Sequence, residues 1–132
     1  MNNITDIVRF FEIRTHDRWG EGHYGASRGG RTHNGIDIVI SPHRPLYAWD
    51  DIRLERIANP YANDARYSGA KYKWGDFEVK VFYFHPIVQD FFSKGDIIGV
   101  SGDLTAKYPG ITPHIHFEMR LKGEIINPEK YL

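Results

Sequence analysis

The stretch His114-Ile115-His116-Phe117-Glu118-Met119-Arg120-Leu121 decides the fold, because polar and apolar residues alternate through the whole of it. Residues two apart on a β-strand point to the same face of the sheet. The odd-numbered residues therefore form an apolar stripe, and the even-numbered ones form a polar face that begins with His114 and His116. The stretch predicts a strand that covers a core with one face and presents two imidazoles side by side on the other.

The rest of the chain also favours short strands over helices. Alternating or apolar runs predict strands at residues 36–40, 46–49, 52–58, 77–84, 96–100 and 124–126, with a bulge within 52–58 and a hairpin turn at Lys122-Gly123. Residues 15–35 and 59–75 are expected to be long loops, and the aromatic residues of the second loop are expected to cover the core. Residues 86–94 suggest a helical turn, and residues 1–12 suggest a short helix or an edge strand. The sequence predicts a mainly β, antiparallel fold.

The composition is that of a single globular domain spanning residues 1–132. Of these residues, 41% are hydrophobic and 26% are charged, which suffices for one core. The 17 basic and 17 acidic residues cancel, so no strong field favours nucleic acid or an anionic membrane. There is no cysteine, which excludes disulfides, a thiol nucleophile and cysteine-bound zinc. Any metal must be held by His, Asp or Glu.

No export or membrane segment is visible in the sequence. Residues 1–10 lack the basic start and long apolar run of a signal peptide. No apolar run approaches the roughly 20 residues of a membrane span, so we expect no membrane insertion. A chain without cysteine is compatible with either redox compartment, so cysteine usage does not settle the localisation.

A second motif, His33-Asn34-Gly35-Ile36-Asp37, lies well upstream of the histidine pair. His33 and Asp37 are four residues apart, so on a strand they share a face. Together with His114 and His116, they can supply a set of two His and one Asp with an open fourth position, as a catalytic zinc requires. The alternative is that the pair is merely solvated, but two imidazoles in register beside an apolar stripe favour metal ligands.

The remaining histidines are less informative. His85 ends the run 77–84 and precedes Pro86, which restricts the residue before it. By strand parity His85 groups with Val79 and Val81, so a plain core histidine is as good an interpretation as a site residue. The other candidates lie in loops without partners at ligand spacing and are expected to be exposed to solvent: His16, His23 and His43, and likewise Arg28, Arg31 and Arg44.

These motifs resemble the M23 family of zinc metallopeptidases, of the lysostaphin and LytM type. The shared elements follow in order as His33-Asn34-Gly35-Ile36-Asp37, Phe82-Tyr83-Phe84-His85, the Gly-rich turn from Lys94 to Gly102, and Pro113-His114-Ile115-His116-Phe117-Glu118. The resemblance covers about residues 31–120 as a motif-bearing core, with residues 1–30 as an N-terminal segment and loop. The chain departs from the family pattern at Pro86 and in the longer turn of residues 104–112.

The resemblance implies a compact antiparallel β fold with little helix, whose long loops flank a groove. It implies one zinc ion per chain held by His33, Asp37 and His116. His114 would be a catalytic histidine beside the metal, and His85 its partner. The implied activity is a zinc-dependent endopeptidase that hydrolyses stem or cross-bridge peptides of bacterial peptidoglycan through a metal-activated water. Glu118 would be either a partner of a ligating histidine or a surface carboxylate.

The resemblance also leads to expectations about the source and the partners of the protein, and two alternative functions stay open. We expect a monomer that acts on the cell wall, as a phage or prophage product released at lysis or carried in a virion. One alternative is a non-catalytic M23-like domain that binds or regulates at the cell wall. Another is a non-haem iron oxygenase, which also uses two His and one carboxylate. Its usual His-x-Asp spacing has one intervening residue, whereas His33 and Asp37 have three between them.

Overall fold

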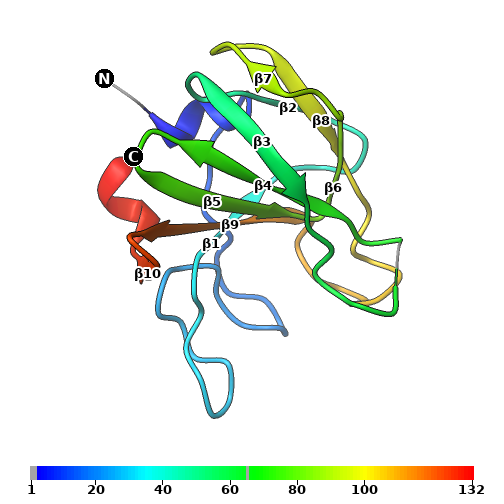
Figure 1. The fold of residues 1–132 in the computed structure, drawn as a ribbon. Coiled ribbons are helices and arrows are strands. Elements are labelled where there is room, and N and C mark those ends of the chain that lie inside the picture. Colours follow the sequence, from blue (N-terminus) through cyan, green and yellow to red (C-terminus); the bar gives the residue numbers. More distant parts are fainter. Residues whose placement is uncertain (1–2, 65) are drawn as a thin grey trace.

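Short β-strands and two 3₁₀ helices make up the regular structure of the computed structural model, which describes residues 3–64 and 66–132 (Figure 1). In chain order the elements are η1 (Ile4–Ile7), β1 (Ile36–Val39), β2 (Pro45–Tyr47), β3 (Ile52–Ile57), β4 (Gly69–Trp74), β5 (Phe77–Phe82), β6 (Phe84–Pro86), β7 (Phe91–Phe92), β8 (Ile97–Ser101), β9 (His114–Leu121), β10 (Glu124–Ile126) and η2 (Pro128–Tyr131). The predicted mainly β, antiparallel class is confirmed.

Most strands belong to one large antiparallel sheet, in the order β1-β9-β5-β4-β3-β7, with β10 paired to the second half of β9. The first half of β9 pairs with β1, and β5 lies along its other side. A smaller sheet has the order β2-β8-β6. In Figure 1 the blue and cyan segment before β1 hangs below the large sheet, and the loops before β4 and β9 lie on the side opposite the termini.

The core joins residues of both sheets. Ile115, Phe117 and Met119 of the predicted apolar stripe are fully buried. Trp49 lies among them and packs edge to face on Phe117, with ring centroids 5.2 Å apart, and on Tyr72 at 6.0 Å. The other face of β9 is therefore left for His114, His116 and Glu118, as the alternation predicts.

Two predictions about segments are wrong. β4 lies within the range 59–75 that the sequence presents as a loop, because its buried residues Ala70, Tyr72 and Trp74 alternate with lysines that have low strand propensity. Residues 86–94 form no helical turn. Their backbone pairs with distant strands instead: the Ile87 N–H donates to the Ile98 carbonyl (2.8 Å). The predicted bulge within β3 is confirmed by a register shift between Leu54 and Arg56.

A backbone break separates β5 from β6. Tyr83 lies between them with φ of 74°, a left-handed conformation that is rare and costly for a bulky residue. Its N–H donates to the Ser68 carbonyl (2.8 Å), and its carbonyl accepts from the Gly102 N–H (3.0 Å). The chain leaves the large sheet after Phe82 and joins the small sheet at Phe84. Side-chain parity therefore does not continue across Tyr83.

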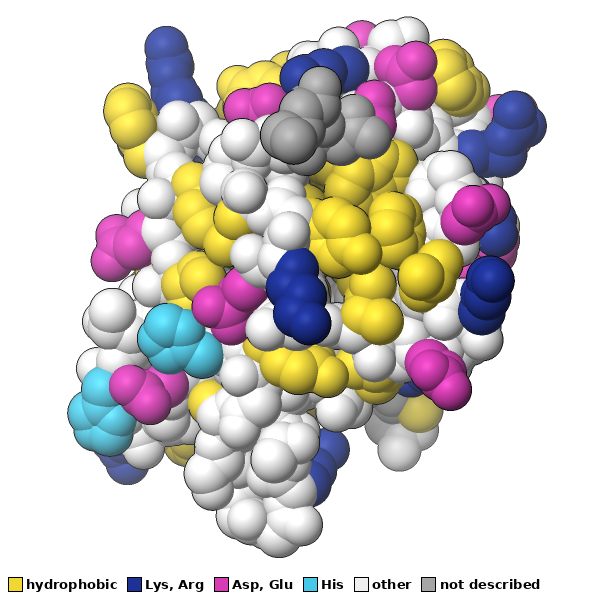
Figure 2. Space-filling model, turned by 90° about the vertical axis from the view of Figure 1, so that its left-hand side faces the viewer, with side chains coloured by type: hydrophobic (Ala, Val, Ile, Leu, Met, Phe, Trp, Pro, Cys, Tyr) yellow, Lys and Arg dark blue, Asp and Glu magenta, His cyan; other side chains and the backbone are white. Residues whose placement is uncertain are grey.

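The side of the molecule near the termini presents hydrophobic side chains at its centre and charged side chains around them (Figure 2). Near the C-terminus, Tyr131 of η2 packs edge to face on Phe77, with ring centroids 5.1 Å apart. Among the described residues, no helix has the length and hydropathy that crossing a membrane would require.

Candidate metal centre and active site

Strand pairing brings the two sequence motifs together. Asp37 of β1 lies directly opposite His116 of β9, and Val39 lies opposite His114. His33 reaches the same place from the end of the preceding loop. The close approach requires Gly35, because a Cβ at this position would lie 2.3 Å from the carbonyl oxygen of Phe117. The tight pairing of β1 with β9 therefore brings His33 and Asp37 next to His116.

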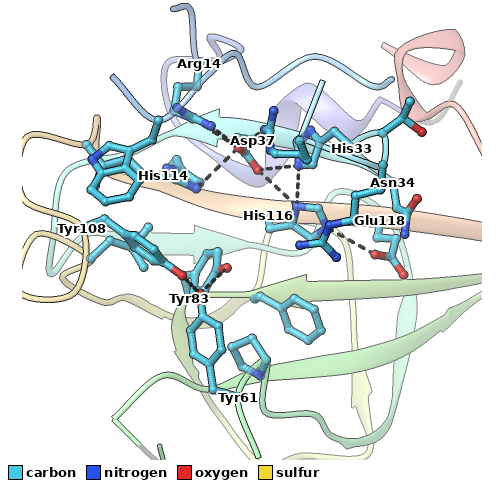
Figure 3. Close-up of a pocket in the computed structure, with 18 residues that line it drawn as sticks. Arg14, His33, Asn34, Asp37, Tyr61, Tyr83, Tyr108, His114, His116 and Glu118 are labelled. Carbon is cyan, nitrogen blue, oxygen red and sulfur yellow. Dashed lines mark hydrogen bonds and ion pairs between the residues drawn. The ribbon is translucent and has the colours of Figure 1, made fainter. Parts of the chain in front are cut away.

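Three side-chain atoms of these motifs form a small triangle (Figure 3). His33 Nε2 lies 3.1 Å from His116 Nδ1 and 3.2 Å from Asp37 Oδ1, and the third side, from His116 Nδ1 to Asp37 Oδ1, is 3.1 Å. Ligands about 2.0–2.1 Å from a tetrahedral zinc lie about 3.3 Å from one another. The group can therefore hold one metal ion at three corners of a tetrahedron.

The outer nitrogens of both histidines are tied to acceptors. His33 Nδ1 lies 3.0 Å from the His23 carbonyl oxygen, and His116 Nε2 lies 3.3 Å from Glu118 Oε1. Such partners fix the proton on the outer nitrogen of a ligating imidazole. Once the proton of the metal-free site is displaced, the inner nitrogens and Asp37 Oδ1 present three lone pairs to one point. A cation is the group that such a donor set fits.

In the metal-free site, the same contacts determine the protonation of His116 and Asp37. Burial alone would lower the pKa of His116, but Asp37 and Glu118 outweigh it and raise that pKa to about 9. Burial alone would raise the pKa of Asp37, but hydrogen bonds to His116 and His33 hold it well below its usual range. Asp37 is therefore a carboxylate at neutral pH. The proton on His116 must be displaced when a metal binds.

His114 lies beside this triangle without belonging to it. Its Nδ1 donates to the Thr112 carbonyl (2.7 Å), and its Nε2 lies 3.6 Å from Asp37 Oδ2. The ring is 5% exposed, and this burial lowers the pKa of His114 below its ordinary value of 6.5. A neutral imidazole whose Nδ1 carries the proton can accept a proton at Nε2, next to the metal position.

Two arginines that the sequence does not single out as site residues hold the outer oxygen of Asp37. Arg14 donates to Asp37 Oδ2 from Nε (3.1 Å) and from Nη2 (3.0 Å). Arg28 Nη2 lies 3.6 Å from the same oxygen and donates to the Glu21 carbonyl. The prediction that Arg28 is solvated is therefore wrong for this residue. Neither arginine has a ligand-like spacing in the sequence, so only the folded loop reveals them.

A pocket of about 410 Å³ opens over the metal position. Its opposite wall carries Tyr61, Tyr83 and Tyr108 from three separate loops (Figure 3). The Tyr61 hydroxyl hydrogen-bonds to the hydroxyls of Tyr108 and of Tyr83, the latter at 3.2 Å. Burial raises the pKa of Tyr83 to about 12, so its hydroxyl stays protonated at neutral pH. The Tyr83 ring packs edge to face on His114, with centroids 5.6 Å apart.

His85 is the predicted catalytic residue that the structure does not bring to the pocket. It is exposed on β6 and does not line the pocket, whereas Tyr83, two residues earlier, does. The alternative interpretation of His85 as a core residue is wrong, because the side chain is exposed. Both follow from the left-handed backbone at Tyr83, which resets the parity: Tyr83 turns toward the pocket, Phe84 into the core and His85 toward solvent.

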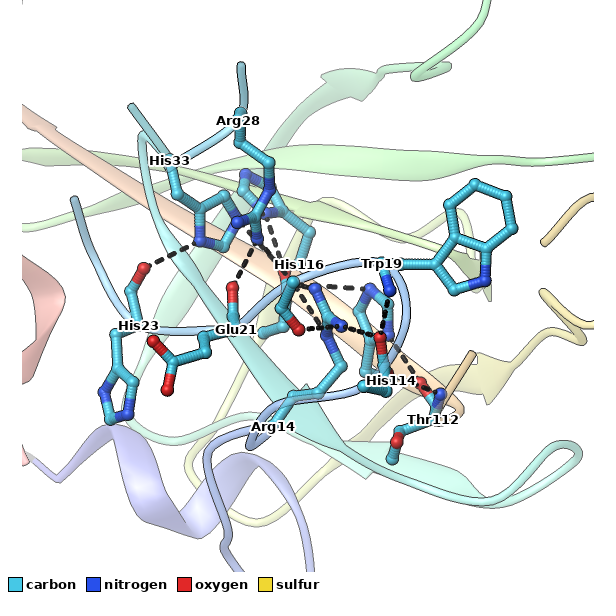
Figure 4. A network of polar contacts seen from close by, with 12 residues as sticks. Arg14, Trp19, Glu21, His23, Arg28, His33, Thr112, His114 and His116 are labelled. Carbon is cyan, nitrogen blue, oxygen red and sulfur yellow. Dashed lines mark hydrogen bonds and ion pairs between the residues drawn. The ribbon is translucent and has the colours of Figure 1, made fainter. Parts of the chain in front are cut away.

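The loop histidines stay outside the metal triangle. His16 and His43 are exposed, as predicted. The His23 side chain is 49% exposed, yet its backbone carbonyl accepts the hydrogen bond that orients His33 (Figure 4). A backbone role of this kind leaves no signal in the side-chain pattern.

Sequence comparison finds close relatives. The chain is 35% identical to leukocyte cell-derived chemotaxin-2 of Bos taurus over 123 residues, which cover 92% of this chain and 80% of the relative. It is 37% identical to the Mus musculus protein of the same name over 109 residues, which cover 81% of this chain and 72% of that one. No model of a known protein family matches the chain.

Solved structures share the fold at low identity. The antimicrobial peptidase lysostaphin from Staphylococcus simulans superposes with a TM-score of 0.68 at 18% identity, over 99% of this chain and 53% of that one. The catalytic domain of the prophage-encoded M23 protein EnpA from Enterococcus faecalis gives 0.59 at 21%, over 89% and 96%. A chain of the SpoIIQ–SpoIIIAH pore-forming complex gives 0.69 at 14%, over 100% and 92%. The chain therefore has the lysostaphin/LytM type of fold.

Proposed function

The chain belongs to the leukocyte cell-derived chemotaxin-2 family, and within that family we propose that it acts as a zinc-dependent peptidase. The zinc would be held by His33, Asp37 and His116, one ion per chain. The expected substrates are short peptides of bacterial peptidoglycan. This proposal joins the geometry of the metal triangle to the fold shared with lysostaphin.

One observation carries the proposal: the triangle has three protein ligands and opens into a pocket. Structural zinc sites are closed by four protein ligands, whereas catalytic sites leave the fourth position to water or substrate. His114, a further imidazole that lines the pocket, has its Nε2 3.6 Å from Asp37 Oδ2 and does not complete the set. The absence of cysteine from the chain removes the commonest fourth ligand of a structural site.

The side chains around the pocket suit hydrolysis of a carbonyl compound. Zinc bound there would supply a Lewis acid that lowers the pKa of a water molecule to about 7 and polarises the substrate carbonyl. His114 can take a proton from a water at Nε2 and return it to the leaving amine. Tyr83 offers a protonated hydroxyl as donor to the developing oxyanion. Glu118 and the His23 carbonyl keep the two ligating imidazoles in the correct orientation.

The pocket also favours a short peptide over a large or strongly charged ligand. Its metal side carries charges that are largely paired within the protein, and its opposite wall carries uncharged tyrosine hydroxyls. Backbone amides hydrogen-bond well to such hydroxyls. We propose that the protein works on the cell wall as a monomer and that its source is a phage or prophage.

The test measures metal and bond cleavage separately. Elemental analysis of purified protein should find about one zinc per chain, whereas iron in its place would favour the oxygenase alternative. Peptidoglycans with different cross-bridges are then digested, and mass spectrometry of the fragments identifies new amine termini. His114→Ala serves as the matched control that should keep zinc and lose cleavage. Zinc without any cleavage by the unmodified protein would contradict the proposal.

A second candidate is a zinc-holding domain that binds the cell wall without cutting it. The position of His85 favours it, since the partner histidine implied by the M23 resemblance lies outside the pocket. The fold matches a chain of the pore-forming SpoIIQ–SpoIIIAH complex as well as it matches the peptidase lysostaphin. The fold alone therefore does not decide between a peptidase and a domain that binds without cutting. Binding to insoluble peptidoglycan without release of amine termini would support this candidate.

A further inference from the structure

We propose that Arg14 and Asp17 form a clamp that positions both the metal ligand Asp37 and the base His114. The clamp links the two through hydrogen bonds from the start of the long loop that ends at His33. The inference rests on the proposed metal site, because it assigns these residues a role toward the Asp37 carboxylate and the His114 ring. Both act through Asp37 and His114 and are not among the atoms that could hold the metal, so both are positioning residues.

The first half of the clamp is the Arg14 guanidinium. Its side chain is 2% exposed and donates twice to Asp37 Oδ2. The remaining nitrogen, Nη1, donates to Asp17 Oδ1 (2.9 Å) and to the Gly20 carbonyl (2.9 Å). Two N–H groups of one planar guanidinium act as a fork that holds this single oxygen in a defined place. With Oδ2 held by Arg14, only Oδ1 remains to face the metal position.

The second half of the clamp is the Asp17 carboxylate. Besides Arg14, its Oδ1 accepts from the Trp19 N–H (2.8 Å), and its Oδ2 accepts from the Thr112 N–H (3.0 Å). The Thr112 carbonyl in turn accepts from His114 Nδ1 (2.7 Å). Asp17 therefore holds the short segment that fixes the tautomer and the ring orientation of His114. Figure 4 shows Arg14, Thr112 and His114 in this network.

The backbone keeps the clamp in place. The Arg14 N–H donates to the Asp37 carbonyl (2.8 Å), the Gly22 N–H donates to the Arg14 carbonyl (2.9 Å), and the Asp37 N–H donates to the Gly22 carbonyl (2.9 Å). A Cβ at Gly22 would lie 2.7 Å from Arg14 Cβ and 2.9 Å from Asp37 Cβ. The loop therefore packs on the ligand with no room for a side chain.

The first experiment tests the arginine fork through metal binding. Arg14→Lys keeps the charge but loses the fork, and Arg14→Met loses both. Arg18→Met is the matched control, because Arg18 is exposed in the same loop and contacts the Trp19 ring instead of Asp37. Zinc affinity is measured by competition with a chelator, and the geometry is read from the absorption bands of the Co²⁺ form.

We expect both Arg14 variants to lose about 10–100-fold in zinc affinity, as is typical when a partner of a metal ligand is removed. Their Co²⁺ spectra should change, because Asp37 is free to turn its second oxygen toward the metal. Arg18→Met should match the unmodified protein in both. Unchanged affinity and an unchanged Co²⁺ spectrum in Arg14→Lys would overturn the clamp. If Arg14→Met does not fold, Arg14→Lys alone still decides.

The second experiment tests Asp17 through the ring of His114. Arg14 and Thr112 donate to different oxygens of Asp17, and Asp17→Asn replaces one of these oxygens by an NH₂ group that cannot accept, so one of the two bonds is lost. NMR of ¹⁵N-labelled imidazoles should then show faster exchange of the His114 Nδ1 proton, while the zinc content stays complete. An unchanged exchange rate would overturn this half. Neither readout uses peptide cleavage, so an inactive but zinc-binding protein would refute the proposed function and leave the clamp standing.

Discussion

The two walls of the pocket are built in different ways. The metal wall uses β1 and β9, whose direct pairing fixes Asp37 opposite His116. Each of its side chains has a second partner, such as Glu118 for His116. The aromatic wall uses loops instead, and Tyr61 holds its tyrosines together through shared hydroxyl contacts. One wall is therefore positioned by strand pairing, and the other by loop backbone and by contacts among its own side chains.

This difference predicts a division of labour between the walls. Groups that must stay within a fraction of an ångström, such as metal ligands, suit paired strands. Groups that adapt to substrates suit loops, which vary without disturbing the sheet. We therefore expect changes to the metal wall to abolish metal binding. Changes to the aromatic wall should alter turnover while leaving the metal in place.

The largest effect is expected from removing a ligand. His33→Ala should reduce zinc from about one per chain to nearly none by elemental analysis. It should also remove the stabilisation by bound metal, about 2.7 kcal/mol when free zinc is 100 times the Kd. Asp37→Ala should destabilise further, because it leaves the Arg14 charge buried without its main partner. Full zinc content in Tyr108→Phe is the control, and its loss there would contradict the division between the walls.

A smaller but still large effect is expected from His114→Ala. Loss of a general base costs about 10²–10⁴-fold in rate, so kcat should fall within this range. Zinc content should stay complete, because His114 Nε2 lies outside the metal triangle. Single-turnover cleavage of a peptidoglycan fragment measures the rate. Loss of zinc in this variant would show that His114 is a ligand rather than a base.

The sequence predicts the metal wall well and the aromatic wall poorly, for a physical reason. Within one unbroken strand, side-chain direction follows from counting residues, so His114 and His116 can be placed on the face opposite Phe117. Arg14 and Tyr83 reach the site through loop contacts that span long sequence distances, and no periodicity marks them. The positive φ of Tyr83 also breaks the alternation of side chains, so the direction of His85 cannot be predicted from residue spacing. β4 is missed for a different reason: Lys71 and Lys73 lower the strand propensity of a segment that pairing with β3 and β5 stabilises.

Tyr83→Phe probes the aromatic wall directly. Removing one donor to a developing oxyanion costs about 10²–10³-fold in kcat, and KM should change little if the donor acts only in the transition state. Tyr61→Phe is the matched control, since its hydroxyl bonds to the other tyrosines, and its loss should cost less than Tyr83→Phe. Equal kcat values for Tyr83→Phe and the unmodified protein would remove Tyr83 from the proposed chemistry.

A moderate effect on stability is expected from acid, through Asp17. Burial would raise the pKa of Asp17, but the Thr112 and Trp19 N–H groups and Arg14 outweigh it and lower that pKa from 3.8 to about 2. Because the folded pKa is depressed, the stabilisation is complete above the unfolded value and is lost as pH falls from about 4 to about 2. The shift corresponds to about 2 kcal/mol.

Urea unfolding at a series of pH values measures this contribution. Asp17→Asn should be less stable than the unmodified protein at pH 7 and should show a smaller loss of stability between pH 4 and pH 2. Parallel pH profiles for the two proteins would contradict the assignment. The metal-free form is used for both, so that release of metal in acid does not add to the difference.

The smallest effect is expected from His85→Ala, and it separates the sequence pattern from the folded geometry. Tyr83-Phe84-His85 and His114-Ile115-His116 share the same two-residue spacing, but only the second pair lies on one continuous strand. His85 is exposed and lies outside the pocket, so its removal should change stability by less than about 0.5 kcal/mol. Zinc content and kcat should stay at the unmodified values. If kcat instead fell as far as in His114→Ala, the M23 pattern would be the better guide, and the backbone at Tyr83 would have to rearrange when substrate binds.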